Sequence, residues 1–246
     1  MIAGHECHVE IIVGLDQPKI DGDLERFVEQ HNQIKVYHPG KHLGRSEMRN
    51  SLVSLARFDW VLFIDADCNP AKRDYLRRYL SQVDNNRTQK VICGGIRYAS
   101  QKPMPAYRLH WTVGSYREQL NHQKRNKQPW RYFFTGNVLI RKELLISTPF
   151  ERYAEGYGYE DIALGYLLFK TGVNVRHISN EVIHEGLKDA KTFLRDSKSA
   201  MQNLSDVHLA GQIGQTPLIT VYEKMDKYRL VQPFLVLMSS IQPLVK

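Results

Sequence analysis

Two pairs of acidic residues have the type and spacing for chemistry. Asp65 and Asp67 follow the apolar run WVLFI, and Glu160 and Asp161 lie in the segment GYGYEDIALGY. Residues at i and i+2 of an extended chain point to the same side, so the first pair can face one ion. Hard divalent cations such as Mg²⁺ take one or two carboxylates and complete their shell with phosphate oxygens and water. The first pair therefore predicts a clamp for a metal ion and a diphosphate.

Each pair also has an interpretation that needs no ligand. At roughly 5 % Asp, a chain of this length contains about one Asp-X-Asp by chance. A second copy, DGD, begins at residue 21 and suits the capped start of a helix. Acids in the first turn of a helix, where the second pair stands, offset the helix dipole. Position alone supports both interpretations of the first pair equally, although open α/β sheets do bind ligands outside the carboxyl ends of their strands.

The elements that must position these acids alternate between short apolar runs and segments of helical periodicity. The run before Asp65 indicates a buried central strand. The alternation is typical of βαβ units and predicts an α/β fold with a mixed, mainly parallel sheet flanked by helices. Strands are expected at 9–15, 34–39, 60–66, 90–98, 173–178 and 181–185.

Helical periodicity also predicts which side chains are buried. The helix after Asp65 repeats apolar residues at i, i+3, i+4 and i+7, namely Leu76, Tyr79, Leu80 and Val83. The helix after Asp161 should present Ile162, Gly165, Tyr166 and Phe169 and end at Gly172. A helix over 188–204 should pack through Phe193, Leu194, Met201 and Leu204.

Two stretches lie outside this alternation. Residues 99–130 carry three prolines, and the basic run KRNKQPWR begins near their end; we expect a mobile or helical excursion over the site. The tail LVQPFLVLMSSIQPLVK is apolar and flanked by basic residues, so it is expected to dock on its own domain, with peripheral contact to a membrane as the alternative. We expect one domain over 1–205 and a C-terminal helical, apolar extension over 206–246.

The composition narrows the classes of function. The 246 residues are 42 % hydrophobic, which suits a globular core, and the net charge of +8 would serve nucleic acid, an anionic membrane or a phosphorylated substrate. Three cysteines without zinc-ligand spacing indicate free thiols and a reducing cytoplasmic setting. The start lacks the pattern of a secretory signal and no long apolar run is present, so we expect a soluble or peripheral protein.

Four motifs together resemble one enzyme family. They are GRSEMRN (44–50), FIDADCNP (63–70), FFTGNVLIRKELL (133–145) and GYGYEDIALGY (156–166). In this order and spacing the sequence resembles the family-2 glycosyltransferases of the GT-A fold over about residues 9–205. The resemblance is nearest to bacterial members, which assemble polysaccharides or glycolipids.

The resemblance implies a role for each matching residue. In that family the Asp-X-Asp carboxylates hold Mn²⁺ or Mg²⁺ on the diphosphate of a nucleotide-sugar, and one acid of the Glu-Asp pair is the catalytic base. The matches imply the following assignments: metal, Asp65, Asp67 and His184; donor binding, Asp16, Arg45, Asp65, Gly136 and Asn137; catalysis, Asp161 as base and Glu160 as its acceptor-binding partner. Arg49 and Asn50 could equally be surface residues of a helix. A lone histidine is more often a structural residue than a ligand, so both interpretations of His184 stay open.

The chemistry itself needs one base and one metal clamp. Inverting sugar transfer requires a carboxylate to take the proton of the acceptor hydroxyl while a metal stabilises the leaving diphosphate. We therefore expect a metal-dependent, inverting transferase acting from a nucleotide-sugar on a glycan or lipid-linked acceptor, without nucleic acid as a partner. The alternatives are a nucleotidyltransferase, a non-catalytic glycan-binding or scaffold protein derived from a transferase, and a nucleic-acid-binding module, for which the basic run with Trp130 would be suited.

One departure from the family pattern concerns the first strand. Family members begin with an apolar strand that forms part of the nucleotide pocket, whereas the first strand here matches the family's second. A sheet without an internal strand leaves neighbouring backbone groups unpaired. We therefore expect reduced stability and weakened donor binding for residues 1–246 alone.

Overall fold

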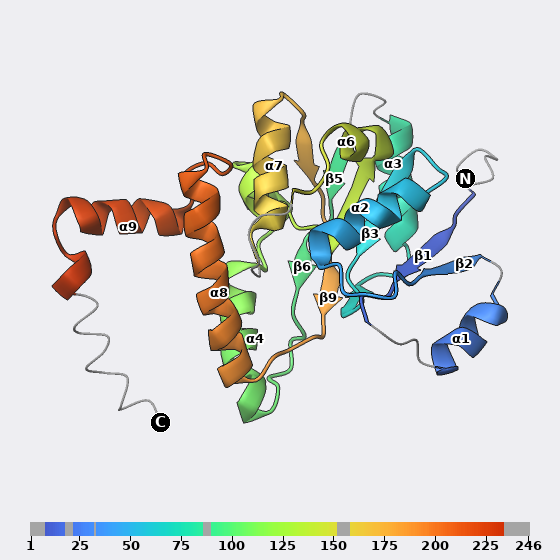
Figure 1. The fold of residues 1–246 in the computed structure, drawn as a ribbon, viewed down its shortest axis with the longest axis horizontal. Helices are drawn as coiled ribbons and strands as arrows, with labels where there is room; N and C mark the ends of the chain where they lie inside the picture. The colour runs from blue at the N-terminus through green and yellow to red at the C-terminus, as the bar shows by residue number, and fades with distance from the viewer. Residues whose placement is uncertain (1–7, 18–21, 32, 86–89, 152–157, 234–246) are drawn as a thin grey trace. The chain divides into compact units, whose positions relative to one another are not determined.

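The computed structural model describes residues 8–17, 22–31, 33–85, 90–151 and 158–233. The chain divides into two compact units, Met1–Gln212 and Ile213–Lys246. The first unit is an α/β structure with helices on both faces of its largest sheet (Figure 1). Both pairs of acids lie in this unit, whereas Cys7, Asp21 and Gly156, with most of the apolar tail, fall outside the described residues.

The largest sheet forms the centre of the first unit. Its order is β3-β7-β5-β8, in strands Trp60–Ile64, Asn137–Arg141, Val91–Cys93 and Val175–His177. β7 runs antiparallel to both of its neighbours, and β5 pairs with β8 in parallel. Apolar side chains fill both faces of β5 and β7, which explains their continuous apolar sequence.

Two smaller sheets flank the largest one. β1 (Ile11–Gly14) pairs in parallel with β2 (Ile34–Tyr37). The other sheet has the order β4-β9-β6, in strands Cys68–Pro70, Val182–His184 and Ile96–Arg97. The register of β4 against β9 sets Cys68 opposite His184, which brings the end of the Asp-X-Asp motif beside the late histidine.

Helices cover the two faces of the largest sheet with separate cores. On one face, Val53 of α2 (Arg45–Leu55), Leu145 of α6 (Lys142–Ser147) and Leu164 of α7 (Glu160–Lys170) join a core with Phe63, Val138 and Ile140. On the other face, Tyr75 and Tyr79 of α3 (Tyr75–Asn85) pack against Ile92 and Leu139. A short helix α1 (Gly22–Glu29) connects β1 to β2 and carries Asp23 of the second Asp-X-Asp copy in its first turn.

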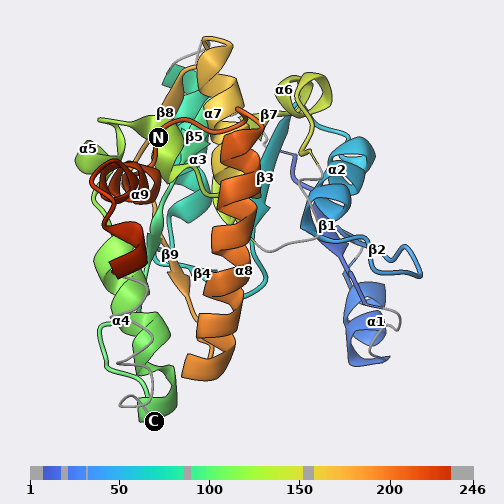
Figure 2. The same ribbon diagram turned by 60° about the vertical axis from the view of Figure 1, so that its left-hand side comes forward.

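The excursion after β6 is helical and anchored. It contains η1 (Pro105–Tyr107), α4 (Arg108–Arg117), α5 (His122–Arg125) and η2 (Pro129–Tyr132). The buried guanidinium of Arg125 donates to the carbonyls of Gly94 and Ile178, at 3.1 and 2.9 Å, and bonds to His177. The last long helix of the unit, α8 (Ala190–Leu209), lies alongside α4 (Figure 2).

The second unit contains α9 (Pro217–Lys227). The hydroxyl of Thr216, the residue before this helix, accepts the backbone N–H of Ile219 and so caps the first turn. None of the helices among the described residues is both long and apolar enough to cross a membrane. Cys68 and Cys93 are free, buried thiols, as expected, and burial raises the pKa of each to about 12.

The sheet differs from the expectation in two respects. Three of the six described strand pairings are antiparallel, so the sheet is mixed but less parallel than expected. β3 was predicted to be a central strand, yet β7 is its only partner among the described strands, and Ile64 is 40 % exposed. The apolar run of β3 suits burial on both sides, but no described strand pairs with its second edge.

Candidate functional site

The end of β3 presents the first pair of acids. Asp65 follows the last strand residue, and its backbone N–H donates to the carbonyl of Gly136 at 3.4 Å. The chain then turns, with the N–H of Cys68 donating to the carbonyl of Asp65, and enters β4. This turn separates the two carboxylates: Asp65 faces α2, and Asp67 faces β9.

Helix α2 places a buried arginine between the two pairs of acids. The Arg49 side chain is 10 % exposed, and its guanidinium lies 3.5 Å from Asp65, 3.5 Å from Glu160 and 3.0 Å from Asp161. One turn earlier on the same helix, Arg45 lies 3.3 Å from Glu160. Burial lowers the pKa of Arg49, but the three carboxylates outweigh it, and the net effect is a raised pKa. The guanidinium is therefore a permanent positive charge at the centre of the site.

The first turn of α7 presents the second pair. Asp161 accepts hydrogen bonds from the N–H and the hydroxyl of Thr135, at 3.1 and 2.6 Å, in addition to its bond from Arg49. These bonds use three of the about four acceptor positions of a carboxylate. Tyr159, which precedes the helix, has a φ of 70°, a strained conformation for a residue other than glycine. Such strain is typical of functional segments.

Two histidines stand beside Asp67. His184 Nε2 lies 3.6 Å from the Asp67 carboxylate, and the rings of His184 and His110 are 5.5 Å apart. His110, from α4, stacks on Phe193 of α8 and accepts the backbone N–H of Lys188 at 2.9 Å. Burial lowers the pKa of His110 to about 4, so the ring is neutral at pH 7. Sequence reasoning missed His110, because a single histidine in the excursion carries no spacing signal.

The described residues do not form a closed metal site. Among the described residues, no three histidine, cysteine or acidic side chains are close enough together to enclose a metal ion. Burial raises the pKa of Asp65, with a smaller opposing effect from Arg49. Two carboxylates, with the remaining positions left to phosphate and water, match the preference of Mg²⁺. Asp65 and Asp67 supply carboxylate oxygens of the kind that such an ion takes, but contrary to the expectation that both face one point, their partners lie on different elements, Arg49 of α2 for Asp65 and His184 of β9 for Asp67.

Two of the predicted donor-binding residues, Gly136 and Asp16, contact Asp65 or the start of α2. Gly136 lies against the site, since a Cβ built there would approach the Asp65 carboxylate to 2.8 Å. Asp16 follows β1, and its carboxylate accepts the N–H groups of Leu43 and Gly44, just before α2, at 2.6 and 2.9 Å. Its described contacts thus orient α2, and with it Arg45.

Asn137 belongs to the interior instead. Its side chain is fully buried, accepts the hydroxyls of Tyr75 and Tyr79 at 2.6 Å each, and donates to the carbonyls of Gly95 and Asn180. All four of its hydrogen-bonding positions are occupied by the protein. The structure therefore does not bring this predicted residue to the ligand side of the site.

The residues most undervalued from the sequence are Arg49 and Asn50. The side chain of Asn50 exchanges two hydrogen bonds with the backbone of Phe150, at 2.8 and 2.9 Å, and the guanidinium of Arg49 lies over the Phe150 ring. The signal was their place in GRSEMRN, but helical periodicity alone could not distinguish a buried arginine from a solvated one.

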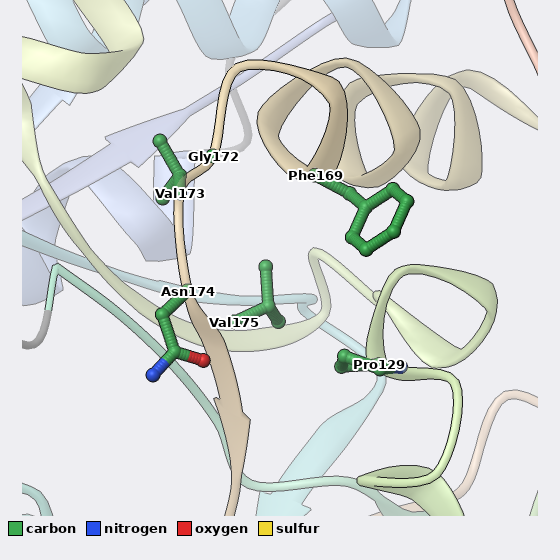
Figure 3. A pocket seen from close by; sticks show the side chains of 6 residues that line it. All are labelled: Pro129, Phe169, Gly172, Val173, Asn174 and Val175. Carbon is green, nitrogen blue, oxygen red and sulfur yellow. The ribbon is translucent and has the colours of Figure 1, made fainter.

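A cavity of about 230 Å³ lies away from these residues (Figure 3). It is lined by Pro129, Phe169, Gly172, Val173, Asn174 and Val175. Phe169 is nine residues from Glu160, which is about 13 Å along the helix. The cavity has no acidic or basic lining residue, so it does not supply the chemistry described above.

An α/β fold with a metal-compatible Asp-X-Asp at a strand end, and a second acid pair at a helix start beside it, defines a GT-A glycosyltransferase architecture. The family model for glycosyl transferase family 2 matches residues 5–148, more than half of the chain. The chain therefore belongs to glycosyl transferase family 2. No curated protein matches the sequence.

Two solved structures with TM-scores above 0.5 show the same fold at low identity. The mannosyl-3-phosphoglycerate synthase from Rubrobacter xylanophilus is 17 % identical with a TM-score of 0.54, and the match covers 85 % of this chain and 67 % of that one. A mycobacterial protein is also 17 % identical, with a TM-score of 0.56 and coverage of 84 % and 65 %. TarS 1–349 from S. aureus is 16 % identical with a TM-score of 0.48; the match covers 73 % of this chain but spans only 50 % of TarS.

Proposed function

We propose that the protein is a metal-dependent, inverting glycosyltransferase that moves a sugar from a nucleotide-sugar to a hydroxyl of a glycan or lipid-linked acceptor. The observation that carries the proposal is the arrangement around Arg49, which lies 3.5 Å from Asp65 and 3.0 Å from Asp161. One side chain thus joins the carboxylate suited to the donor metal and the carboxylate suited to the acceptor.

The proposed reaction is a single displacement at the anomeric carbon. Asp161 takes the proton of the acceptor hydroxyl, and the freed oxygen forms the new bond to that carbon. The bond between the carbon and the diphosphate oxygen breaks on the opposite side, and its electron pair leaves with the nucleoside diphosphate. Thr135 and Arg49 hold the Asp161 carboxylate, and Glu160 lies beside it to orient the acceptor.

The donor side is assigned to the end of β3 and the start of α2. Asp65 and Asp67 would hold Mn²⁺ or Mg²⁺, with His184 next to the second carboxylate. When bound, such a cation neutralises charge that develops on the leaving diphosphate. Arg45 pairs with Glu160 at 3.3 Å, and its half-exposed guanidinium is suited to a phosphate. Asp16 fixes the loop that presents Arg45, so its part in donor binding is indirect.

Location and further partners follow as proposals from the same chemistry. A cytoplasmic enzyme, soluble or peripheral at the inner face of a membrane, would meet both nucleotide-sugars and lipid-linked acceptors. The positive net charge is then explained by phosphorylated substrates, without nucleic acid.

The proposal is tested by separating metal-dependent binding from transfer. Thermal unfolding is followed with UDP, GDP, CMP and TDP, each with and without Mn²⁺; a ligand at about 100 times its Kd adds roughly 2.7 kcal/mol. We expect Asp67→Asn to lose the Mn²⁺-dependent shift. We expect Asp161→Asn to keep the shift and to lose about 10²-fold or more in release of the nucleoside diphosphate with an acceptor present.

A matched control removes one acid elsewhere. Asp74 is exposed at the start of α3 and pairs with Arg78 at 2.9 Å, so Asp74→Asn should keep both shift and turnover. An equal Mn²⁺-dependent shift in the wild type and in Asp67→Asn would refute the metal assignment. A shift with no transfer to any acceptor would favour the glycan-binding alternative.

A further inference from the structure

Neighbouring residues fix the position of the Arg49 side chain. Its guanidinium carbon lies 5.5 Å from the centre of the Phe150 ring, a cation–π distance. Asn50, the next residue of α2, fixes the backbone of Phe150 through two hydrogen bonds. The helix therefore holds both the arginine and the ring beneath it, and the guanidinium has little freedom to leave the site.

The contacts of Arg49 divide between its two terminal nitrogens. Nη2 faces Asp65, whereas Nη1 faces Asp161 and Glu160. The planar fork can therefore serve both sides at once, which a lysine ammonium cannot do with the same geometry. The shortest contact, 3.0 Å, is the one to Asp161.

The positive charge of Arg49 also bears on metal binding at Asp65. Asp65 already has a cation of the protein itself, the Arg49 guanidinium, at 3.5 Å. Any divalent ion that binds Asp65 must share its carboxylate with the guanidinium or displace it. Like charges a few ångströms apart in a partly buried site repel strongly, so the two cations oppose each other.

We propose that Arg49 is a positioning residue that links Asp65 to Asp161 in one charge network and competes with the divalent cation for Asp65. The inference rests on the proposed function and deepens it. Occupation of the donor side would weaken the contact to Asp65 and leave Glu160 and Asp161 as the partners of the guanidinium. Donor binding would thereby strengthen the contact between Arg49 and Asp161, the proposed base.

The link is tested first in metal-free buffer with a chelator. Denaturant unfolding is measured for Arg49→Gln, Asp65→Asn, Asp161→Asn and the two double variants that include Arg49→Gln. We expect each double variant to lose less stability than the sum of its single variants, because the shared contact can be lost only once. Arg49→Gln with Asp74→Asn should be additive. Additive losses for Arg49 with Asp65 would overturn the link.

Competition is tested by titration with Mn²⁺ alone, followed through the paramagnetic resonance signal of the free ion. We expect Arg49→Gln to bind Mn²⁺ roughly tenfold more tightly than the wild type, while its turnover falls. A purely structural arginine would weaken both. Arg78→Gln, which removes the same charge from an exposed pair on α3, should leave Mn²⁺ affinity unchanged.

The remaining outcomes also decide the question. Equal or weaker Mn²⁺ binding by a folded Arg49→Gln would overturn the competition. If neither the wild type nor any variant binds Mn²⁺, both the competition and the metal part of the proposed function fail, whereas the metal-free measurements still decide the link. If Arg49→Gln does not fold, Arg49→Lys replaces it in both tests and should retain Mn²⁺ affinity within about threefold while losing turnover.

Discussion

Gly136 controls how closely the backbone of the FFTGN segment approaches the donor side. A Cβ at this position would lie 2.3 Å from the Phe134 ring and 2.8 Å from a carboxylate oxygen of Asp65. Both groups would have to rotate away. We expect Gly136→Ala to weaken Mn²⁺ binding by about tenfold, the lower range for a displaced neighbour of a metal ligand. Isothermal titration with Mn²⁺ measures the effect.

The matched control for this change is Gly22→Ala. A Cβ at Gly22, in the first turn of α1, meets no described atom within 4 Å. It should leave Mn²⁺ affinity unchanged. Unaltered affinity in a folded Gly136→Ala would show that the Asp65 carboxylate can move without loss, which would argue against its role as a ligand.

The acids of the site could be predicted from the sequence, but their partners could not. Asp-X-Asp at a strand end and Glu-Asp at a helix start are local patterns, visible from neighbouring residues. The contacts of Asp161 with Thr135 and Arg49 join residues 26 and 112 positions apart. The hydrogen bonds of Asn137 could not be predicted for the same reason, since the tyrosines that donate to it belong to α3.

At the scale of elements, the excursion is coupled to the sheet through a neutral histidine. His177, the last residue of β8, is 1 % exposed; its Nδ1 lies 3.0 Å from Arg125, and its Nε2 lies 2.9 Å from the carbonyl of Pro129. Because Arg125 can only donate, Nδ1 must be the unprotonated acceptor. Burial, with a smaller effect from Arg125, lowers the pKa of His177 to about 4.

This arrangement predicts a pH dependence of stability. Between pH 6.5 and about 4 the unfolded chain binds a proton at this position and the folded chain does not, so stability is complete above pH 6.5 and falls as the pH falls. The full contribution is about 3 kcal/mol. Denaturant unfolding at pH 7.5, 6 and 5 should show a smaller decline for His177→Gln than for the wild type. The exposed His31→Gln should decline as the wild type does; an unchanged decline in His177→Gln would contradict the assignment.

The existence of most elements followed from apolar periodicity, whereas the buried faces of helices followed only in part: Tyr79 and Leu204 are buried as expected, but other predicted positions are not. In α3 the sheet is contacted by Tyr75 and Tyr79, and Leu76 is 50 % exposed. In α8, Leu194 and Met201 are exposed although both were expected to be buried. Each helix carries apolar residues over more than one stripe, so periodicity permits two orientations. The tertiary contacts select one of them.

At the scale of the whole molecule, the first unit contains parts of unequal stability. β5 and β7 have fully buried residues, Val91, Val138 and Ile140, and each strand pairs on both edges. β1 and β2 form a sheet of two strands, and Ile11 is 47 % exposed. Isolated two-stranded sheets are marginal in water, so β1 and β2 depend on what packs against them.

Helix α2 supplies most of that support. Met48 and Leu52 lie directly over Gly14, and a Cβ there would approach the Met48 sulfur to 2.8 Å. At the other end of β1, Glu10 accepts the backbone N–H of Arg57 at 2.6 Å and pairs with its side chain at 2.8 Å. The same helix carries Arg45 and Arg49, so the order of β1 and the order of the site depend on a common element.

Amide hydrogen exchange should therefore proceed in two stages. We expect Ile11 to Val13 to exchange through a local opening of lower free energy than that of β5 and β7, whose exchange should require global unfolding. Glu10→Gln removes a charged anchor of β1 and should speed exchange at Ile11 to Val13, while the rates at Val138 and Ile140 stay as they are. Mass spectrometry of peptides that cover β1 and β7 measures both rates. Equal exchange free energies in the two strands would mean that the first unit unfolds as one cooperative body, and that β1 draws support from contacts beyond α2.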